Sequence, residues 1–162
     1  PSIQECLTFC ERIGAISAYA YLGDITQSVT GDKKAQAFED SYLDELFAVL
    51  TALGFRAVTY MPNRNTPAQL ARVQTLCRQR GLFEISGVDI NSPRQEFTCP
   101  EIRQTQFRHL IDSAWALIGH EAAATQDPDR GMFAGKTAQT YPDMQRRIEA
   151  FARIGLRQRE RF

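Results

Sequence analysis

The chain has 162 residues, of which 43% are hydrophobic and 23% are charged, a composition typical of one globular domain. Its 19 basic and 19 acidic residues give no formal net charge, which argues against a sequence-independent nucleic-acid binder and against a protein that binds acidic membranes. No apolar run reaches the roughly 18 residues of a membrane span, and no basic-then-apolar leader opens the sequence, so we expect a cytoplasmic protein with a small-molecule ligand.

The first predicted element is a helix, because apolar residues recur at helical spacing from Ile3 to Ile13. Ser2 is placed to cap the start of this helix, and Gly14 is placed to end it in a left-handed turn. The next residues, 15–22, have the length and aromatic content of a buried strand.

A polar segment, residues 24–38, separates this strand from the next helix. It exceeds the usual length of a connection, which predicts either a functional loop or a partly ordered one. A strongly amphipathic helix then starts at Glu39 and ends at Gly54, and residues 55–60 are predicted to form the second strand.

A third unit of the same kind follows. Thr66 and Pro67 form a cap and first turn, Gly81 ends the helix, and residues 82–86 are predicted to form a strand. Strands separated by helices predict right-handed crossovers and parallel pairing, in a barrel or in a doubly wound sheet.

The sequence beyond Asn91 is mainly helical. It contains a long helix with an apolar stripe between Phe107 and Ile118, a loop over residues 125–140, and a last helix that starts at Pro142 and ends at Gly155. The basic residues after that glycine are expected to form a solvated terminus. No second domain is indicated, so residues 1–162 are interpreted as a single α/β domain.

The four cysteines are expected to be reduced and without a chemical role, because a leaderless chain of this size with an apolar core does not need disulfides. Cys6 and Cys10 lie one turn apart on the first predicted helix, beside apolar residues. This pattern favours core packing of both thiols over zinc ligation.

Ligands of parallel α/β folds collect at the carboxyl ends of the strands, so a site is expected in the segments that follow the three strands. Asp89 lies between apolar neighbours there, which suits a metal ligand or a general base; a helix cap or a loop-tying carboxylate is the alternative. The polar residues of these segments are Tyr21, Asp24 and residues 31–34; Asn63, Arg64 and Asn65; and Ser86, Asp89, Asn91 and Arg94.

Two arginines in these segments are candidates for binding an anion. Arg64 and Arg94 are placed to bind a phosphate or a carboxylate bidentately, and a surface salt bridge is the alternative for each. Lys33 and Lys34 lie in the long polar segment, where they form either part of a lid over an anionic substrate or a solvated charge pair.

Two other patterns resemble known motifs but do not have the required spacing. Residues 131–137 (GMFAGKT) resemble a phosphate loop but are one residue short and follow a helix where a strand is required. His120 and Glu121 begin like a zinc-protease helix, but position 124 is alanine. His109 and His120 are predicted to be structural or surface residues, remote from the strand ends. The sequence therefore does not support a Ser-His or Cys-His hydrolytic site.

Taken together, two runs resemble the polymerase and histidinol phosphatase (PHP) family of metal-dependent phosphoesterases. Residues 10–24 (CERIGAISAYAYLGD) are similar to the helix, glycine and strand before the family's metal-binding Ala-His-Pro. Residues 43–91 are similar to the next helix, strand and helix and to the final Gly-Ser-Asp-x-His motif. The similarity covers about half of the chain, from Glu5 to Asn91.

The resemblance implies an α/β fold made of the later β/α units of a (β/α)7 barrel-like fold with parallel strands, followed by additional C-terminal helices. Residues 1–91 would form the PHP-like units and residues 92–162 a mainly helical extension. The family's earlier ligands are absent, and the chain starts without methionine at Pro1, so we expect it to be a fragment of a longer protein. An exposed sheet edge would then be covered in a homodimer or by the missing N-terminal half.

The same resemblance implies the site. Tyr21 falls where the Ala-His-Pro histidine would be, Asp89 matches the aspartate of the final motif, and Asn91 replaces its histidine. Asp89 and Asn91 are therefore the expected ligands of a divalent zinc, manganese or iron ion, in a depleted, oxygen-rich site.

Catalysis of phosphoester hydrolysis is assigned to Asp89 and Arg94, and binding of a small phosphorylated or anionic substrate to Arg64, Arg94, Tyr21 and Asp24. We expect the fragment to contribute only some of the residues of the site and to be inactive alone. The alternative is a non-catalytic α/β module that binds an anionic metabolite or a protein partner, which the loss of the two histidines favours.

Overall fold

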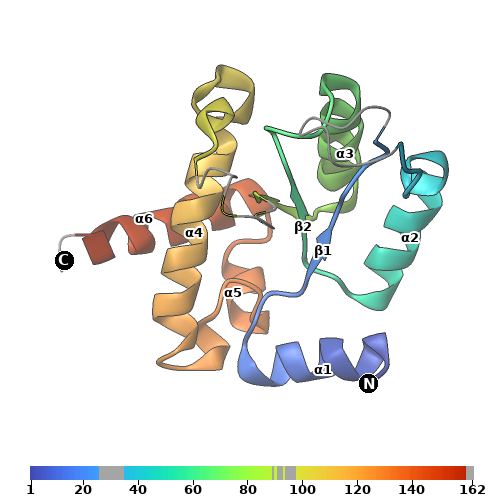
Figure 1. The fold of residues 1–162 in the computed structure, drawn as a ribbon. Helices are drawn as coiled ribbons and strands as arrows, with labels where there is room; N and C mark the ends of the chain where they lie inside the picture. Colours follow the sequence, from blue (N-terminus) through green and yellow to red (C-terminus); the bar gives the residue numbers. More distant parts are fainter. Residues whose placement is uncertain (26–34, 89, 91–92, 94–97, 160–162) are drawn as a thin grey trace.

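The computed structural model describes residues 1–25, 35–88, 90, 93 and 98–159 (Figure 1). Three parallel strands alternate with helices in the first half, and helices make up the second half. In chain order the elements are α1 (Ile3–Ile13), β1 (Ala18–Ala20), η1 (Asp40–Tyr42), α2 (Leu43–Leu53), β2 (Ala57–Tyr60), α3 (Pro67–Arg80), β3 (Phe83–Ser86), η2 (Pro100–Arg103), η3 (Thr105–Phe107), α4 (His109–Ala124), η4 (Pro128–Arg130), α5 (Gly135–Thr140) and α6 (Met144–Arg159).

Helices α1 and α3 begin and end where the local signals predict, whereas the helix predicted to start at Glu39 starts at Leu43, after the short turn η1. Ser2 and Thr66 each accept a hydrogen bond from the backbone N–H three residues on, and the side chains of Glu5 and Gln69 complete two capping boxes. α1, α2 and α3 end at three glycines with left-handed backbone conformations, Gly14, Gly54 and Gly81.

The strands form a parallel sheet in the order β1-β2-β3. Ala18 pairs with Ala57, and Ala57 pairs with Phe83, so consecutive strands are neighbours joined by crossover helices. The α/β class and the parallel pairing are therefore confirmed. β1 is shorter than the predicted strand over residues 15–22, because its ladder with β2 begins only at Ala18.

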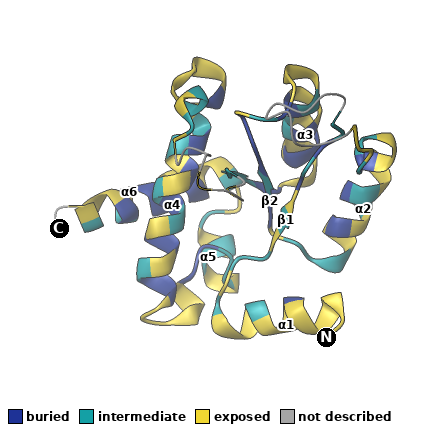
Figure 2. Ribbon diagram, viewed as in Figure 1, coloured by how far each residue is buried: buried dark blue, intermediate teal, exposed yellow. Residues whose placement is uncertain are grey.

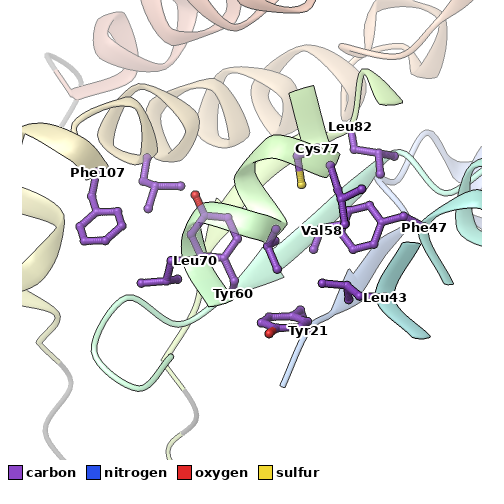
Figure 3. Packing of buried hydrophobic residues seen from close by; sticks show 12 residues of the cluster. Tyr21, Leu43, Phe47, Val58, Tyr60, Leu70, Cys77, Leu82 and Phe107 are labelled. Carbon is purple, nitrogen blue, oxygen red and sulfur yellow. The ribbon is translucent and has the colours of Figure 1, made fainter. Parts of the chain in front are cut away.

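Helices cover both faces of the sheet, so the core has two parts. Val58 and Tyr60 point to one face, where they pack with residues of α2 and α3 (Figure 3). Ala57 and Phe83 point to the other face and pack against α4 and α6. This alternation follows from the two-residue period of a strand, and it fixes which side of the sheet each later side chain reaches.

α4 and α6 cross at two glycines. A Cβ atom at Gly119 would lie 2.0 Å from the Phe151 carbonyl oxygen, and one at Gly155 would lie 2.0 Å from the Trp115 carbonyl oxygen. The prediction that Gly155 ends the last helix is wrong: α6 continues to Arg159, and Gly155 lets the two backbones touch.

α1 buries little of its apolar surface (Figure 2). Leu7 is its only buried residue, whereas Ile3, Phe9 and Ile13 are 57%, 52% and 49% exposed. The predicted core packing of Cys6 is therefore wrong, because its thiol is exposed, while Cys10 is half-buried. In the part of the chain that the structure describes, no helix is long and apolar enough to cross a membrane.

Candidate functional site

The Asp40 carboxylate accepts three hydrogen bonds, two of them from the segment after β1. Its Oδ1 accepts a hydrogen bond from the Tyr21 hydroxyl at 2.5 Å, and its Oδ2 accepts from the Asp24 backbone N–H at 3.0 Å. The Gln69 side-chain amide donates to Oδ2 as well, at 2.7 Å. Asp40 therefore joins the segment that follows β1 to the first turn of α3, which follows β2.

Further hydrogen bonds fix both sides of the long polar segment. Asp24 Oδ1 accepts from the Phe38 N–H at 2.6 Å, and Ile25 pairs with Gln36 in an antiparallel bridge. Glu39, which is 3% exposed, accepts from the Leu22 N–H at 2.8 Å. Residues 21–25 and 35–40 thus form one preorganised unit at the carboxyl end of β1.

Gly23 is required where this unit meets α3. Its φ is +70°, and a Cβ atom there would lie 2.8 Å from the side-chain nitrogens of Asn65 and Gln69. Asn65 is itself buried: it accepts from the Met61 N–H at 2.9 Å and donates to the Leu22 carbonyl at 2.7 Å. The segments after β1 and β2 are therefore fastened together at the carboxyl edge of the sheet.

The charge in this unit is set by hydrogen bonding. Burial acts to raise the pKa of Asp40, but hydrogen bonds from Gln69 and Tyr21 and from the Asp24 backbone lower it overall. Burial, followed by the bond to Asp40, raises the pKa of Tyr21 far above its usual range. At neutral pH Asp40 is a carboxylate, and Tyr21 is a neutral phenol that donates a hydrogen bond to it.

The predicted site residues have different surroundings. Tyr21 and Asp24 belong to the same network, and Tyr21 is 1% exposed. Arg64 is half-buried beside Asn65, and its guanidinium lies 3.9 Å from the Met61 sulfur. The other predicted site residues, Asp89, Asn91 and Arg94, and the pair Lys33 and Lys34 lie outside the described residues.

Sequence reasoning missed Glu39, Asp40 and Gln69 as part of this region. Two adjacent acidic residues just before a helix were the available signal for Glu39 and Asp40. The sequence indicates that Gln69 caps α3, but not that it also contacts Asp40. Its side-chain Oε1 accepts from the Thr66 N–H, and its Nε2 donates to Asp40.

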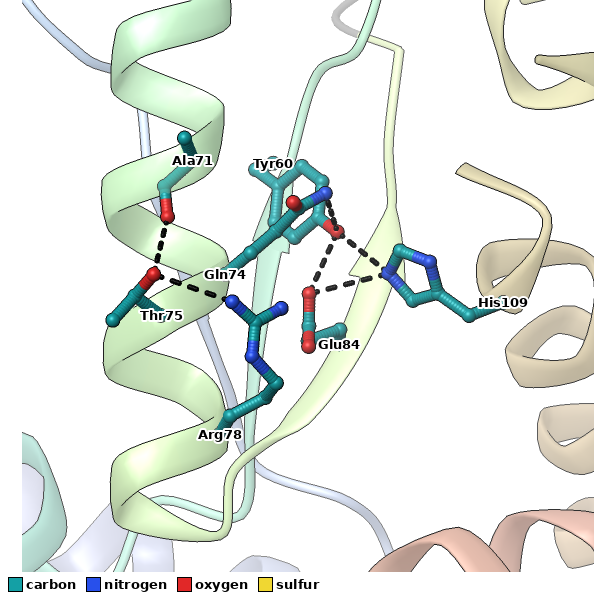
Figure 4. Close-up of polar contacts among 7 residues, drawn as sticks. All are labelled: Tyr60, Ala71, Gln74, Thr75, Arg78, Glu84 and His109. Carbon is teal, nitrogen blue, oxygen red and sulfur yellow. Dashed lines mark hydrogen bonds and ion pairs between the residues drawn. The ribbon is translucent and has the colours of Figure 1, made fainter. Parts of the chain in front are cut away.

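A second polar cluster lies where β2 and β3 meet α4 (Figure 4). The Tyr60 hydroxyl donates to Glu84 Oε2 at 2.8 Å, and His109 Nε2 lies 3.1 Å from that hydroxyl and 3.3 Å from Glu84 Oε2. Gln74 donates to the Tyr60 hydroxyl at 3.2 Å. The expectation that His109 is remote from the strand ends is wrong, because its ring contacts Tyr60, the last residue of β2.

This cluster orients an imidazole that reaches solvent. The side chains of His109 and Glu84 are 35% and 11% exposed, so the carboxylate is the more enclosed partner. Burial, and then the Glu84 charge, raises the pKa of Tyr60 far above its usual range and keeps the phenol neutral. His120, in contrast, is structural: its Nδ1 accepts from the Met132 N–H at 2.9 Å.

Replacing Tyr60 with phenylalanine is expected to lower the free energy of unfolding by about 1–2 kcal/mol, because Gln74 and Glu84 each lose a partner in a buried setting. The matched control is Tyr42→Phe, whose ring is 50% exposed and whose loss of a hydroxyl should change stability by less than about 0.5 kcal/mol. Urea unfolding of both variants measures the difference. Equal stabilities would show that the Tyr60 hydroxyl contributes nothing.

The fold and these clusters define an α/β protein with a parallel sheet and preorganised polar segments at its carboxyl edge. No protein-family model, curated protein or solved structure matches the chain. Among the described residues, no group of three or more histidine, cysteine, aspartate or glutamate side chains is close enough to hold a metal ion.

Proposed function

We propose that this chain is the carboxyl-terminal part of a PHP-like metal-dependent hydrolase that acts on small phosphoesters, with its site at the carboxyl edge of the sheet. The observation that carries the proposal is the network that fastens the segment after β1 to the segment after β2 at that edge. β3 pairs with β2 up to Ser86, so the residues that follow Ser86 leave the sheet at the same edge.

The proposal gives the residues separate roles. Asp89 and Asn91 supply oxygen ligands to a divalent zinc, manganese or iron ion, which when bound supplies an activated water for attack on phosphorus. Arg94, with Arg64, offsets negative charge on the phosphoryl oxygens. Asp89 and Asn91 do not make a complete site alone, and the described residues contain no group of three or more histidine, cysteine, aspartate or glutamate side chains that could hold the ion by itself.

Tyr21 and Asp24 receive a positioning role in this proposal instead of the direct phosphate contact expected from the sequence. Tyr21 is enclosed and its proton is held by Asp40, while Asp24 accepts from the Phe38 N–H. Their effect on a substrate would be indirect, through the conformation of the segment that follows β1.

The proposed fold is the later part of a (β/α)7 barrel. The position of β1 supports it: among the described strands β1 pairs only with β2, and its residues Ala18 and Ala20 are exposed although both faces of a parallel sheet are normally covered. The exposed apolar residues Ile3, Phe9 and Ile13 of α1 lie next to that strand in the chain. Preceding β/α units, or a second copy of the chain, would cover both surfaces.

A second candidate function is a non-catalytic module that binds an anionic metabolite or a protein partner. It is favoured by the carboxylates of Asp24 and Asp40, which are already occupied by hydrogen bonds from the protein. The PHP family has histidines at the positions of Tyr21 and Asn91, and their replacement also favours the binding module.

Metal analysis of the chain purified without chelators tests the proposal. We expect one divalent metal ion per chain, lost in Asp89→Ala and retained in Asp129→Ala, an exposed aspartate far from the strand ends in the sequence. A metal-loaded chain would then be assayed for hydrolysis of phosphomonoesters. Absence of metal above background after reconstitution with zinc, manganese or iron would contradict a hydrolase site in this chain and favour the binding module.

A further inference from the structure

A basic groove of about 450 Å³ lies between η4, α5 and α6. Its charged lining consists of four cations and one carboxylate: Arg130, Lys136, Arg153, Arg157 and Asp129. The whole chain has no formal net charge, so the excess of positive over negative side chains makes this groove a distinctly basic part of the surface. The volume is within the range of small-molecule sites.

The four cations of the groove have no acidic partner in the described part of the chain. The ion pairs found there are Arg56–Glu11, Arg72–Asp44 and His109–Glu84. The Arg130 guanidinium donates a hydrogen bond to the neutral Gln126 side chain, at 2.9 Å. The helix dipole accounts for Arg157, which lies in the last turn of α6, but not for Arg130, Lys136 and Arg153, which come from three elements.

Besides the charged residues, the groove is lined by Thr137, Thr140 and apolar side chains, and part of this lining is fixed in place. Of the lining residues, Phe151 is buried, and Tyr141 and Ile154 are half-buried. The Tyr141 carbonyl accepts two hydrogen bonds, at 3.0 and 2.9 Å, from the guanidinium of Arg147, which is 7% exposed. The wall between α5 and α6 is thus formed before any ligand binds.

The groove is separate from the carboxyl edge of the sheet. η4 begins at Pro128, which packs against Gly14 at the end of α1, before the chain enters β1. In Figure 1, α5 lies toward the end of the sheet where α1 leads into β1, opposite the end where β2 leads toward α3. A ligand in the groove would therefore leave the proposed hydrolase site free.

We propose that this groove binds a small organic molecule that carries two or more phosphate groups. Three guanidinium groups and an ammonium group match several phosphate oxygens, and one phosphate would leave part of this charge unpaired. Phe151, Ile154 and Tyr141 in the lining provide an apolar surface for the organic part. This inference goes beyond the proposed hydrolase function and does not depend on it.

Isothermal titration calorimetry with ATP, AMP, adenosine and inorganic tripolyphosphate, at fixed ionic strength and in EDTA, tests the proposal. We expect affinity to fall from ATP to AMP to adenosine, and ATP to bind more tightly than tripolyphosphate. In Arg153→Gln/Arg157→Gln, ATP should bind at least about tenfold more weakly. The matched control is Arg78→Gln/Arg80→Gln, which removes two exposed charges from the last turn of α3 and should bind ATP as the unmodified chain does.

Three results would overturn the proposal: no binding of ATP at millimolar concentration, equal ATP affinity in the groove variant and the unmodified chain, or tripolyphosphate binding as tightly as ATP. Tighter binding of a single-stranded oligonucleotide than of ATP would also overturn it and would indicate a nucleic-acid surface. The Asp89→Ala variant should bind ATP in EDTA with unchanged affinity, so failure of the metal site and failure of the groove are distinguishable.

Discussion

Gly155→Ala is expected to lower the free energy of unfolding by about 3 kcal/mol or more, because the added methyl group overlaps the backbone of another helix. The new Cβ would lie 2.0 Å from the Trp115 carbonyl oxygen, which is backbone and cannot rotate away. Gly119 meets the Phe151 carbonyl at the same distance, so each helix presents a glycine to the backbone of the other. Relief requires α4 and α6 to separate, which loosens the core that both form with the sheet.

Urea unfolding of Gly155→Ala beside Gly135→Ala measures this effect. Gly135 begins α5 and has no atom within 4 Å of its Cβ position, so its substitution should leave stability unchanged or raise it by up to about 1 kcal/mol. The double variant Gly119→Ala/Gly155→Ala should lose less than the sum of the single losses, because one separation of the helices relieves both contacts. If Gly155→Ala matched Gly135→Ala, the close crossing of α4 and α6 would be contradicted.

Local signals predicted the first half of the fold because the interactions they report are local. The Ser2 and Thr66 capping boxes and the ends of the first three helices at Gly14, Gly54 and Gly81 each depend on residues within one turn. Parallel pairing followed from the alternation of helices and strands, since parallel neighbours need a long crossover.

The prediction for Gly155 failed because the same residue type serves two physical purposes. A glycine in an apolar helical pattern either takes a left-handed conformation at a helix end or admits another backbone at a crossing. Which of the two holds is decided by Trp115, on a helix remote in the sequence. α1 shows the same limit, since its apolar spacing predicted a helix correctly but not that most of its apolar residues would be exposed.

The candidate site was predictable only in part, for a similar reason. Tyr21 and Asp24 stand out because they follow a strand. Asp40 and Gln69 act through contacts between segments far apart in the chain, and His109 reaches Glu84 only because α4 starts against β3. Such partners follow from tertiary packing, which spacing along the chain does not specify.

Asp40→Ala is expected to lower the free energy of unfolding by about 3 kcal/mol, because it removes the acceptor shared by three donors. The donors are the Tyr21 hydroxyl, the Asp24 N–H and the Gln69 amide, and Tyr21 is too enclosed to bond water instead. The matched control is Asp44→Ala, since Asp44 pairs with Arg72 at the surface and its side chain is 64% exposed. That variant should lose less than about 1 kcal/mol in the same urea titration, and equal losses would contradict the role of Asp40.

The contribution of Asp40 is also expected to depend on pH in one direction. Its folded-state pKa is lowered from 3.8, so the folded protein holds the ionised form more strongly than the unfolded chain does. The resulting stabilisation is complete above 3.8 and is lost as the pH falls through the lower folded-state value. Asp40→Asn keeps the shape but has no charge to titrate, so the stability difference between it and the unmodified chain should be constant near neutral pH and shrink in acid.

Urea unfolding of the unmodified chain and Asp40→Asn across this pH range tests the linkage. The difference between the two curves isolates Asp40, because the other carboxylates titrate in both proteins. A difference that stayed constant into strong acid would mean that neutral hydrogen bonds, and not the carboxylate charge, hold the Tyr21 hydroxyl and Gln69 amide in place. A shrinking difference would establish that the charge of Asp40 fastens the segments after β1 and β2 together, and with them the carboxyl edge where the proposed site lies.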